Sequence, residues 1–156
     1  MKILILEDRS PAYKNIKSYM ESLNFEPKIF RKTSQLLEEI NKGTFNENSY
    51  DYYILDLSCP IGKMEEDYAE KTKDGLLTGW IILIYYILKK DLHALDKCII
   101  FSDYKKDLNS YIDNAPHEEK ILYNKINKNA FINKVDGYMK IKKFFINENK
   151  YKEDTS

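Results

Sequence analysis

The stretch KILILED at residues 2–8 decides the fold class. Its apolar residues are continuous rather than alternating, which is typical of a strand buried on both faces in a parallel sheet covered by helices. EPKIF at 26–30 is shorter and more polar and has a proline near its start, as an edge strand tolerates. Three further segments predict strands: DYYILDL at 51–57, KCIIFS at 97–102 and AFINK at 130–134.

Helical patterns separate these strands. Ser10-Pro11 is typical of a helix start and precedes apolar residues at helical spacing up to Leu23, and Thr33 is placed to cap a second helix that Gly43 ends. The other predicted helices cover about 74–90 and 117–126, and a last one follows Asp136. We expect a long polar loop at 61–73 and little order between Asp103 and Pro116.

Alternating strands and helices imply βαβ units, whose right-handed crossovers give a parallel sheet with helices on both faces. The predicted fold is therefore a doubly wound (βα)5 α/β domain. A chain of 156 residues without a Gly/Ser linker favours one domain, at 1–148, with a frayed tail at 149–156. Because this domain uses almost the whole chain, we expect it to stand alone.

The composition excludes several classes of function. Lys plus Arg and Asp plus Glu number 25 each, and there are two arginines, so we expect no nucleic acid partner. Cys59 and Cys98 lie far apart and in no metal-ligand spacing, which indicates a reducing compartment. The first apolar run is interrupted by two acids, and the run at 75–88 is short of the ~20 residues that a membrane span needs. We therefore expect a cytoplasmic protein with no membrane span.

Chemistry-bearing residues follow four of the five strands. The carboxyl ends of parallel strands form the ligand-binding edge of such sheets, and here they carry an acidic pair, an aspartate, a hydroxyl and a lysine. Clustered carboxylates without His or Cys favour a hard cation, and we expect Mg²⁺. Asp56 is then suited to attack a phosphoryl group, with Ser102 and Lys134 on the phosphoryl oxygens. The residues of this predicted site are Glu7, Asp8, Asp56, Ser102 and Lys134.

In order and position these segments resemble the receiver domains of two-component response regulators. The resemblance rests on ILILEDR, YYILDLSCP, the later Asp74-Gly75, CIIFS and AFINK, across nearly the whole chain. It implies the strand order 2-1-3-4-5. It also implies Glu7 and Asp8 as metal carboxylates, Asp56 as phosphoacceptor and metal ligand, Ser58 giving a backbone carbonyl to Mg²⁺, Ser102 as switch hydroxyl, Lys134 as the phosphate-pairing cation and Phe131 as switch aromatic.

The function implied is phosphorelay signal transduction. A histidine kinase or phosphotransfer protein would supply the phosphoryl group, and a downstream effector protein would bind the switched surface. The chemistry is self-phosphorylation and dephosphorylation of a phosphoprotein rather than the turnover of an enzyme.

Several residues depart from the receiver pattern. Val135 stands where a proline is usual, Asp103 stands where a small residue is usual, and the stretches at 61–73 and 104–128 are extended. Val135 and Asp103 favour an alternative, a pseudo-receiver interaction module that is not phosphorylated. A haloacid dehalogenase-type enzyme is a third hypothesis, but its motif would require an aspartate at the position of Ser58.

Each candidate also has a purely structural interpretation. In that interpretation, Glu7 and Asp8 would be an N-cap and part of a solvated turn before the first helix. Cys59 would be a packing residue, and the acids at 65–70 would belong to a solvated loop.

Overall fold

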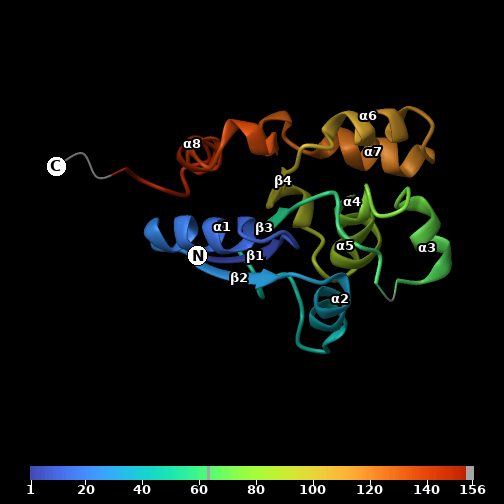
Figure 1. Cartoon of the computed structure of the whole chain (residues 1–156), viewed down its shortest axis with the longest axis horizontal. Helices are drawn as coiled ribbons and strands as arrows, with labels where there is room; N and C mark the ends of the chain where they lie inside the picture. The colour runs from blue at the N-terminus through green and yellow to red at the C-terminus, as the bar shows by residue number, and fades with distance from the viewer. Residues whose placement is uncertain (63, 154–156) are drawn as a thin grey trace.

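Five parallel strands form one sheet in the order β2-β1-β3-β4-β5 in a computed structural model that describes residues 1–62 and 64–153. Its helices lie on both faces, so the predicted doubly wound fold and strand order are confirmed (Figure 1). Apart from Lys2, the residues of the central strands are buried, as their continuous apolar sequences predict, whereas β2 at the edge alternates. The strands are β1 (Lys2–Leu6), β2 (Glu26–Phe30), β3 (Tyr52–Leu55), β4 (Cys98–Phe101) and β5 (Phe131–Ile132).

The helices are α1 (Ala12–Ser22), α2 (Thr33–Asn41), α3 (Glu66–Lys71), α4 (Thr78–Ile82), α5 (Leu88–Lys90), α6 (Lys105–Asp113), α7 (His117–Lys125) and α8 (Met139–Asn147). A π-helical turn at Leu83–Ile87 joins α4 to α5. Helices α1 and α8 lie on the same side of the sheet, and α2 lies on the opposite side of β1 and β2 (Figure 1). The rings of Tyr19 and Tyr138 stack between α1 and the start of α8, with centroids 5.3 Å apart.

Two predicted loops contain helices. Between Asp103 and Pro116, where we expected little order, α6 buries Leu108 and Ile112, a pair four residues apart that its polar neighbours conceal in the sequence. Within the predicted polar loop at 61–73, α3 has acids in its first turn and a lysine in its last, which suits the helix dipole. The helix expected from Asp74 begins only at Thr78, because Lys73, Asp74 and Gly75 adopt positive φ.

The ends of the chain's elements also differ from expectation. The fifth strand is limited to Phe131–Ile132, and Lys134 begins a 3-10 turn that continues to Asp136. The last helix starts at Met139, after this turn. In the predicted tail, Tyr151 packs edge-on against Phe25, with ring centroids 5.9 Å apart; residues 154–156 lie outside the described part of the chain.

A buried carboxylate anchors the α6–α7 hairpin. Glu119 on α7 is 1% exposed and accepts hydrogen bonds from Trp80 Nε1 at 2.9 Å, Tyr85 at 2.8 Å and Tyr111 at 2.9 Å. Lys71 of α3 lies 3.5 Å from it. This one side chain therefore ties α7 to α3, α4, α6 and the π-helical turn, and its charge is satisfied by donors from the rest of the protein.

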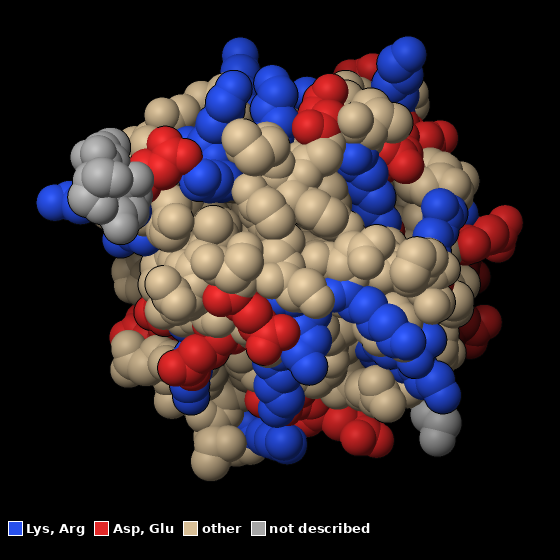
Figure 2. Space-filling view, turned by 60° about the vertical axis from the view of Figure 1, so that its left-hand side comes forward, with Lys and Arg blue, Asp and Glu red and all other residues tan. Residues whose placement is uncertain are grey.

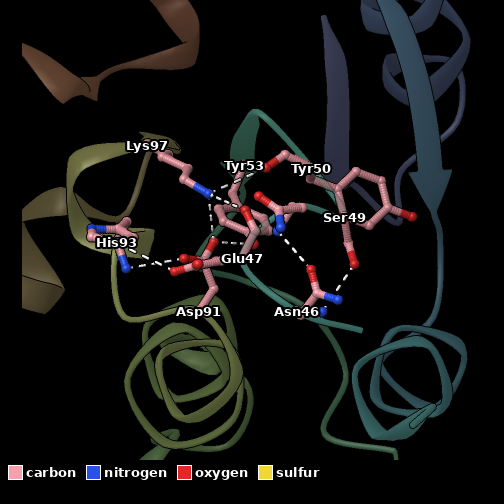
Figure 3. Close-up of polar contacts among 9 residues, drawn as sticks. Asn46, Glu47, Ser49, Tyr50, Tyr53, Asp91, His93 and Lys97 are labelled. Carbon is pink, nitrogen blue, oxygen red and sulfur yellow. Dashed lines mark hydrogen bonds and ion pairs between the residues drawn. The ribbon is translucent and has the colours of Figure 1, made fainter. Parts of the chain in front are cut away.

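A second buried carboxylate lies at the amino end of β3 and β4 (Figure 3). Asp91 is fully buried and accepts hydrogen bonds from Tyr53 at 2.6 Å, from Lys97 Nζ at 2.9 Å and from the backbone N–H of His93 at 3.0 Å. Lys97 also donates to the carbonyl of Glu47 at 2.7 Å, which holds the loop before β3. We call Tyr53, Asp91 and Lys97 the amino-end cluster.

Basic and acidic side chains are interspersed on the face seen in Figure 2, as expected for a chain with equal numbers of each. In the described residues no helix is both long enough and apolar enough to cross a bilayer.

Candidate functional site

The carboxyl ends of β1, β3, β4 and β5 meet and bring the predicted site residues together. Ligand atoms of Glu7, Asp8 and Asp56 all lie within 4.8 Å of one another. Ser102 and Lys134 both contact Asp56, across 46 and 78 residues of sequence. These five residues are named the carboxyl-end cluster.

Asp56 is held through both of its oxygens. Oδ1 accepts from Ser102 Oγ at 2.7 Å and from the backbone N–H of Ser58 at 3.3 Å, and Oδ2 accepts from Lys134 Nζ at 2.6 Å. Lys134 also donates to Glu7 Oε1. Asp56 is 4% exposed, so these charge-assisted contacts lie in a poorly solvated place and fix its orientation.

The backbone around Asp56 is positioned by a close approach of α4. The N–H of Gly79 donates to the carbonyl of Leu57 at 3.0 Å, and a Cβ at position 79 would lie 2.0 Å from the carbonyl oxygen of Asp56. Any larger residue would push α4 away from the strand end. Gly79 is therefore a functional position that sequence reasoning missed, since an isolated glycine in an apolar run indicates close packing only in general.

The two ends of the extended segment between β3 and α4 are joined by hydrogen bonds. Cys59 N donates to the carbonyl of Gly75 at 3.0 Å, and Thr78 Oγ1 donates to the carbonyl of Cys59 at 2.6 Å. Gly75 has φ +92°, and a Cβ there would lie 2.9 Å from Cys59 O, so this closure requires glycine. The cluster of carboxylates that could hold a metal, among residues 1–62 and 64–153, contains none of the acids of α3.

Charge within the cluster is unbalanced. Burial raises the pKa of Glu7, the hydrogen bond from Lys134 opposes this rise, and the charge of Asp56 adds to it. Burial alone would lower the pKa of Lys134, but its hydrogen bonds and charge interactions with Asp56 and Glu7 outweigh burial and raise it. Lys134 therefore stays protonated, and one ammonium faces three carboxyl groups.

The donor set fits a divalent cation. Asp8 Oδ1 is buried and has no hydrogen-bond partner among the residues described, so one carboxylate oxygen beside Glu7 and Asp56 is left unsatisfied. Such an oxygen is costly unless something binds it. The three acids offer only oxygen, the ligand that Mg²⁺ prefers. The residues present therefore fit the predicted magnesium ion.

The remaining predicted residues lie near the cluster. Ser58 contacts Asp56 through its N–H, and the role of its carbonyl stays a prediction. Phe131 is half-buried and packs on Tyr123 of α7, with ring centroids 5.2 Å apart; its role as a switch is also a prediction. Val135 is 83% exposed in the turn after β5, and Asp103 is exposed beside Ser102.

Two residues at the edge of the cluster carried no signal in the sequence. Arg9, directly after the acidic pair, donates through Nη2 to the hydroxyl of Tyr104 at 3.4 Å. The N–H of Tyr104 in turn donates to Ser102 Oγ at 3.3 Å. Only the folded chain reveals this connection, because it joins loops 95 residues apart.

Comparison with known proteins finds matches among solved structures. No protein-family model matches the chain, and no curated protein matches it. Among solved structures, a response regulator receiver domain protein from Clostridium thermocellum is 21% identical, with a TM-score of 0.46 over 81% of this chain and 94% of that one. The receiver domain of a Francisella response regulator is 18% identical, with a TM-score of 0.45 over 79% of this chain and 96% of that one.

This chain resembles response regulator receiver domains. The fold assignment rests on the strand order itself. What the site does has to be argued from its own residues.

Proposed function

We propose that the protein is a receiver-like signalling domain that accepts a phosphoryl group on Asp56 with Mg²⁺ and switches a partner-binding surface. The observation that supports this most is the position of Asp56, oriented by Ser102 and Lys134 beside Glu7 and Asp8. A nucleophilic carboxylate, a cation and a hydroxyl are the groups that phosphoryl transfer to aspartate needs.

The transfer step is an in-line displacement at phosphorus. A carboxylate oxygen of Asp56 attacks the phosphorus of a phosphohistidine donor, the P–N bond breaks, and its electron pair stays on the imidazole nitrogen. Hydrolysis later removes the phosphoryl group. Water attacks phosphorus, the bond between phosphorus and the Asp56 oxygen breaks, and its electron pair stays on that oxygen, which restores the carboxylate.

Each neighbouring residue has a defined role in this step. Lys134, already within 2.6 Å of Asp56, neutralises the phosphoryl oxygens, and Ser102 donates its hydroxyl to one of them. Glu7, Asp8, Asp56 and the carbonyl of Ser58 would hold Mg²⁺, which when bound supplies further positive charge to the phosphoryl oxygens.

The contacts of Ser102 support a switching role. Its hydroxyl bonds to Asp56 and also accepts from the N–H of Tyr104, so a change of partner at Asp56 pulls on the segment that leads into α6. Phe131 packs against α7, on the other arm of the same hairpin. We propose the α6–α7 region as the surface read by an effector protein, with a histidine kinase or phosphotransfer protein as donor, in the cytoplasm.

Intact mass after incubation with acetyl phosphate and Mg²⁺ tests this function. The wild type should gain one phosphoryl group, and Asp56→Asn should gain none. Ser102→Ala is the matched control: it removes a contact of Asp56 but keeps the nucleophile, and should still be labelled. Absence of label on the folded wild type would contradict phosphorylation and favour the pseudo-receiver module.

A further inference from the structure

The entrance to the carboxyl-end cluster is bordered by two loops, residues 7–11 after β1 and residues 102–104 after β4. The contact of Arg9 with Tyr104 joins them, and the contact of Tyr104 with Ser102 continues toward Asp56. Contacts among four residues therefore lead from the exposed edge to the candidate phosphoacceptor, through the hydroxyl of Tyr104 on one side and its backbone N–H on the other.

Burial along this connection runs from outside to inside. Arg9 is exposed, Tyr104 is half-buried, and Ser102 and Asp56 are buried. Lys134, the cation already assigned to the site, contacts Glu7 and Asp56 at the buried end. Arg9 is thus a second cation, at the exposed end of this connection.

The charge balance of the cluster favours a further cation beside it. Three ionised carboxyl groups and one ammonium leave excess negative charge in the cluster, and a bound Mg²⁺ would bring the balance only to neutral, so a further cation would be needed to attract an anionic phosphoryl donor.

The geometry of the Arg9 guanidinium suits the binding of a phosphoryl group. Its planar fork matches phosphoryl oxygens and offers five N–H groups. In the described part of the chain its side chain has one hydrogen-bond acceptor, the Tyr104 hydroxyl, at 3.4 Å. A contact this long is weak and easily exchanged for a phosphoryl oxygen.

We propose that Arg9 binds the phosphoryl group of the incoming donor at the entrance, and that Tyr104 is a positioning residue that holds the guanidinium there beforehand. This inference rests on the proposed function of Asp56. Arg9 exchanges only hydrogen bonds: the attack on phosphorus and the departure of the leaving group proceed at Asp56 as described above.

The test measures the initial rate of phosphoryl gain against acetyl phosphate concentration, with Mg²⁺, by intact mass. Arg9→Ala should raise the half-saturating concentration about tenfold, the effect of one charge-assisted hydrogen bond, while the rate at saturation changes less. It should also weaken the salt dependence of the rate at low donor concentration. Arg9→Lys should fall between, because it keeps the charge without the fork, and Tyr104→Phe should have a smaller effect in the same direction.

Arg31→Ala is the matched control. It removes the other arginine of the sequence, which is exposed after β2 and lies 3.9 Å from the centroid of the Tyr13 ring. Its half-saturating concentration should match the wild type, and equal effects in Arg9→Ala and Arg31→Ala would overturn the proposal in favour of general surface charge.

Labelling of the wild type separates a role of Arg9 from the function of Asp56. If the wild type is labelled at Asp56 and a folded Arg9→Ala shows an unchanged concentration dependence, Arg9 does not bind the donor, and the function of Asp56 stands. If the wild type takes up no phosphoryl group, both are wrong. Should Arg9→Ala fail to fold, Arg9→Lys and Tyr104→Phe decide, and wild-type behaviour in both would overturn the proposal.

Discussion

Strand β3 has a buried polar cluster at each end, and the two are built on opposite principles. At the amino end, one carboxylate, Asp91, is paired with one ammonium and a tyrosine hydroxyl, and both of its oxygens accept hydrogen bonds (Figure 3). At the carboxyl end, three carboxyl groups lie close together, one lysine contacts two of them, Glu7 and Asp56, and Asp8 Oδ1 has no partner in the described residues.

The difference separates structural from functional burial of charge. A balanced, fully hydrogen-bonded cluster holds loops and strands together, and so does Glu119 under the α6–α7 hairpin. Like charges gathered without enough partners destabilise the folded state unless a ligand joins them. The amino-end cluster should therefore matter for stability and the carboxyl-end cluster for binding.

The largest effect is expected at the amino-end cluster. Asp91→Ala leaves the Lys97 ammonium and the Tyr53 hydroxyl without their acceptor, and breaking such a buried pair costs about 3 kcal/mol of the free energy of unfolding. Urea unfolding measures this. The control is Asp96→Ala, at an exposed carboxylate, which should stay within about 0.5 kcal/mol of the wild type. Equal losses in the two variants would refute a stabilising role.

The carboxyl-end cluster should respond in the opposite direction. In EDTA, Asp8→Asn should increase the free energy of unfolding by about 1 kcal/mol, because it removes a like charge beside Glu7 and Asp56. With Mg²⁺ at ten times its Kd, the wild type should gain about 1.4 kcal/mol and the variant much less, so the order reverses. Asp103→Asn, at an exposed acid beside Ser102, should keep the full magnesium response. A wild type indifferent to millimolar Mg²⁺ would remove the metal from this site.

The smallest effect concerns pH. Because the folded state raises the pKa of Glu7, chiefly by burial, it binds this proton more tightly than the unfolded chain does. The resulting stability is present below about pH 4.5, the ordinary value, and is lost as the pH rises through the folded pKa. In EDTA, the free energy of unfolding of Glu7→Gln relative to wild type should therefore increase as the pH rises above 4.5. A flat difference between pH 4 and 7 would mean that Glu7 is not strained in the fold.

Much of this architecture is readable from local pattern. The continuous apolar run before Glu7 and the one before Asp56 specify buried parallel strands, and an acid that follows such a strand directly has to lie at the sheet edge. Helix α6 was not predicted, because two buried residues among seven others, most of them polar, give too weak a helical pattern to recognise in the sequence. Tertiary packing on the rest of the domain stabilises this helix, as is usual for short helices.

The sequence by itself determined the strands, their alternation with helices and the chemical types at the strand ends, because these depend on neighbouring residues and on the handedness of crossovers. Only the tertiary structure decided which charges are satisfied. The partners of Asp56 lie 46 and 78 residues away, those of Glu119 come from four separate segments, and Arg9 meets Tyr104 across 95 residues. Contacts over such separations depend on how whole elements pack, and no local pattern in the chain records them.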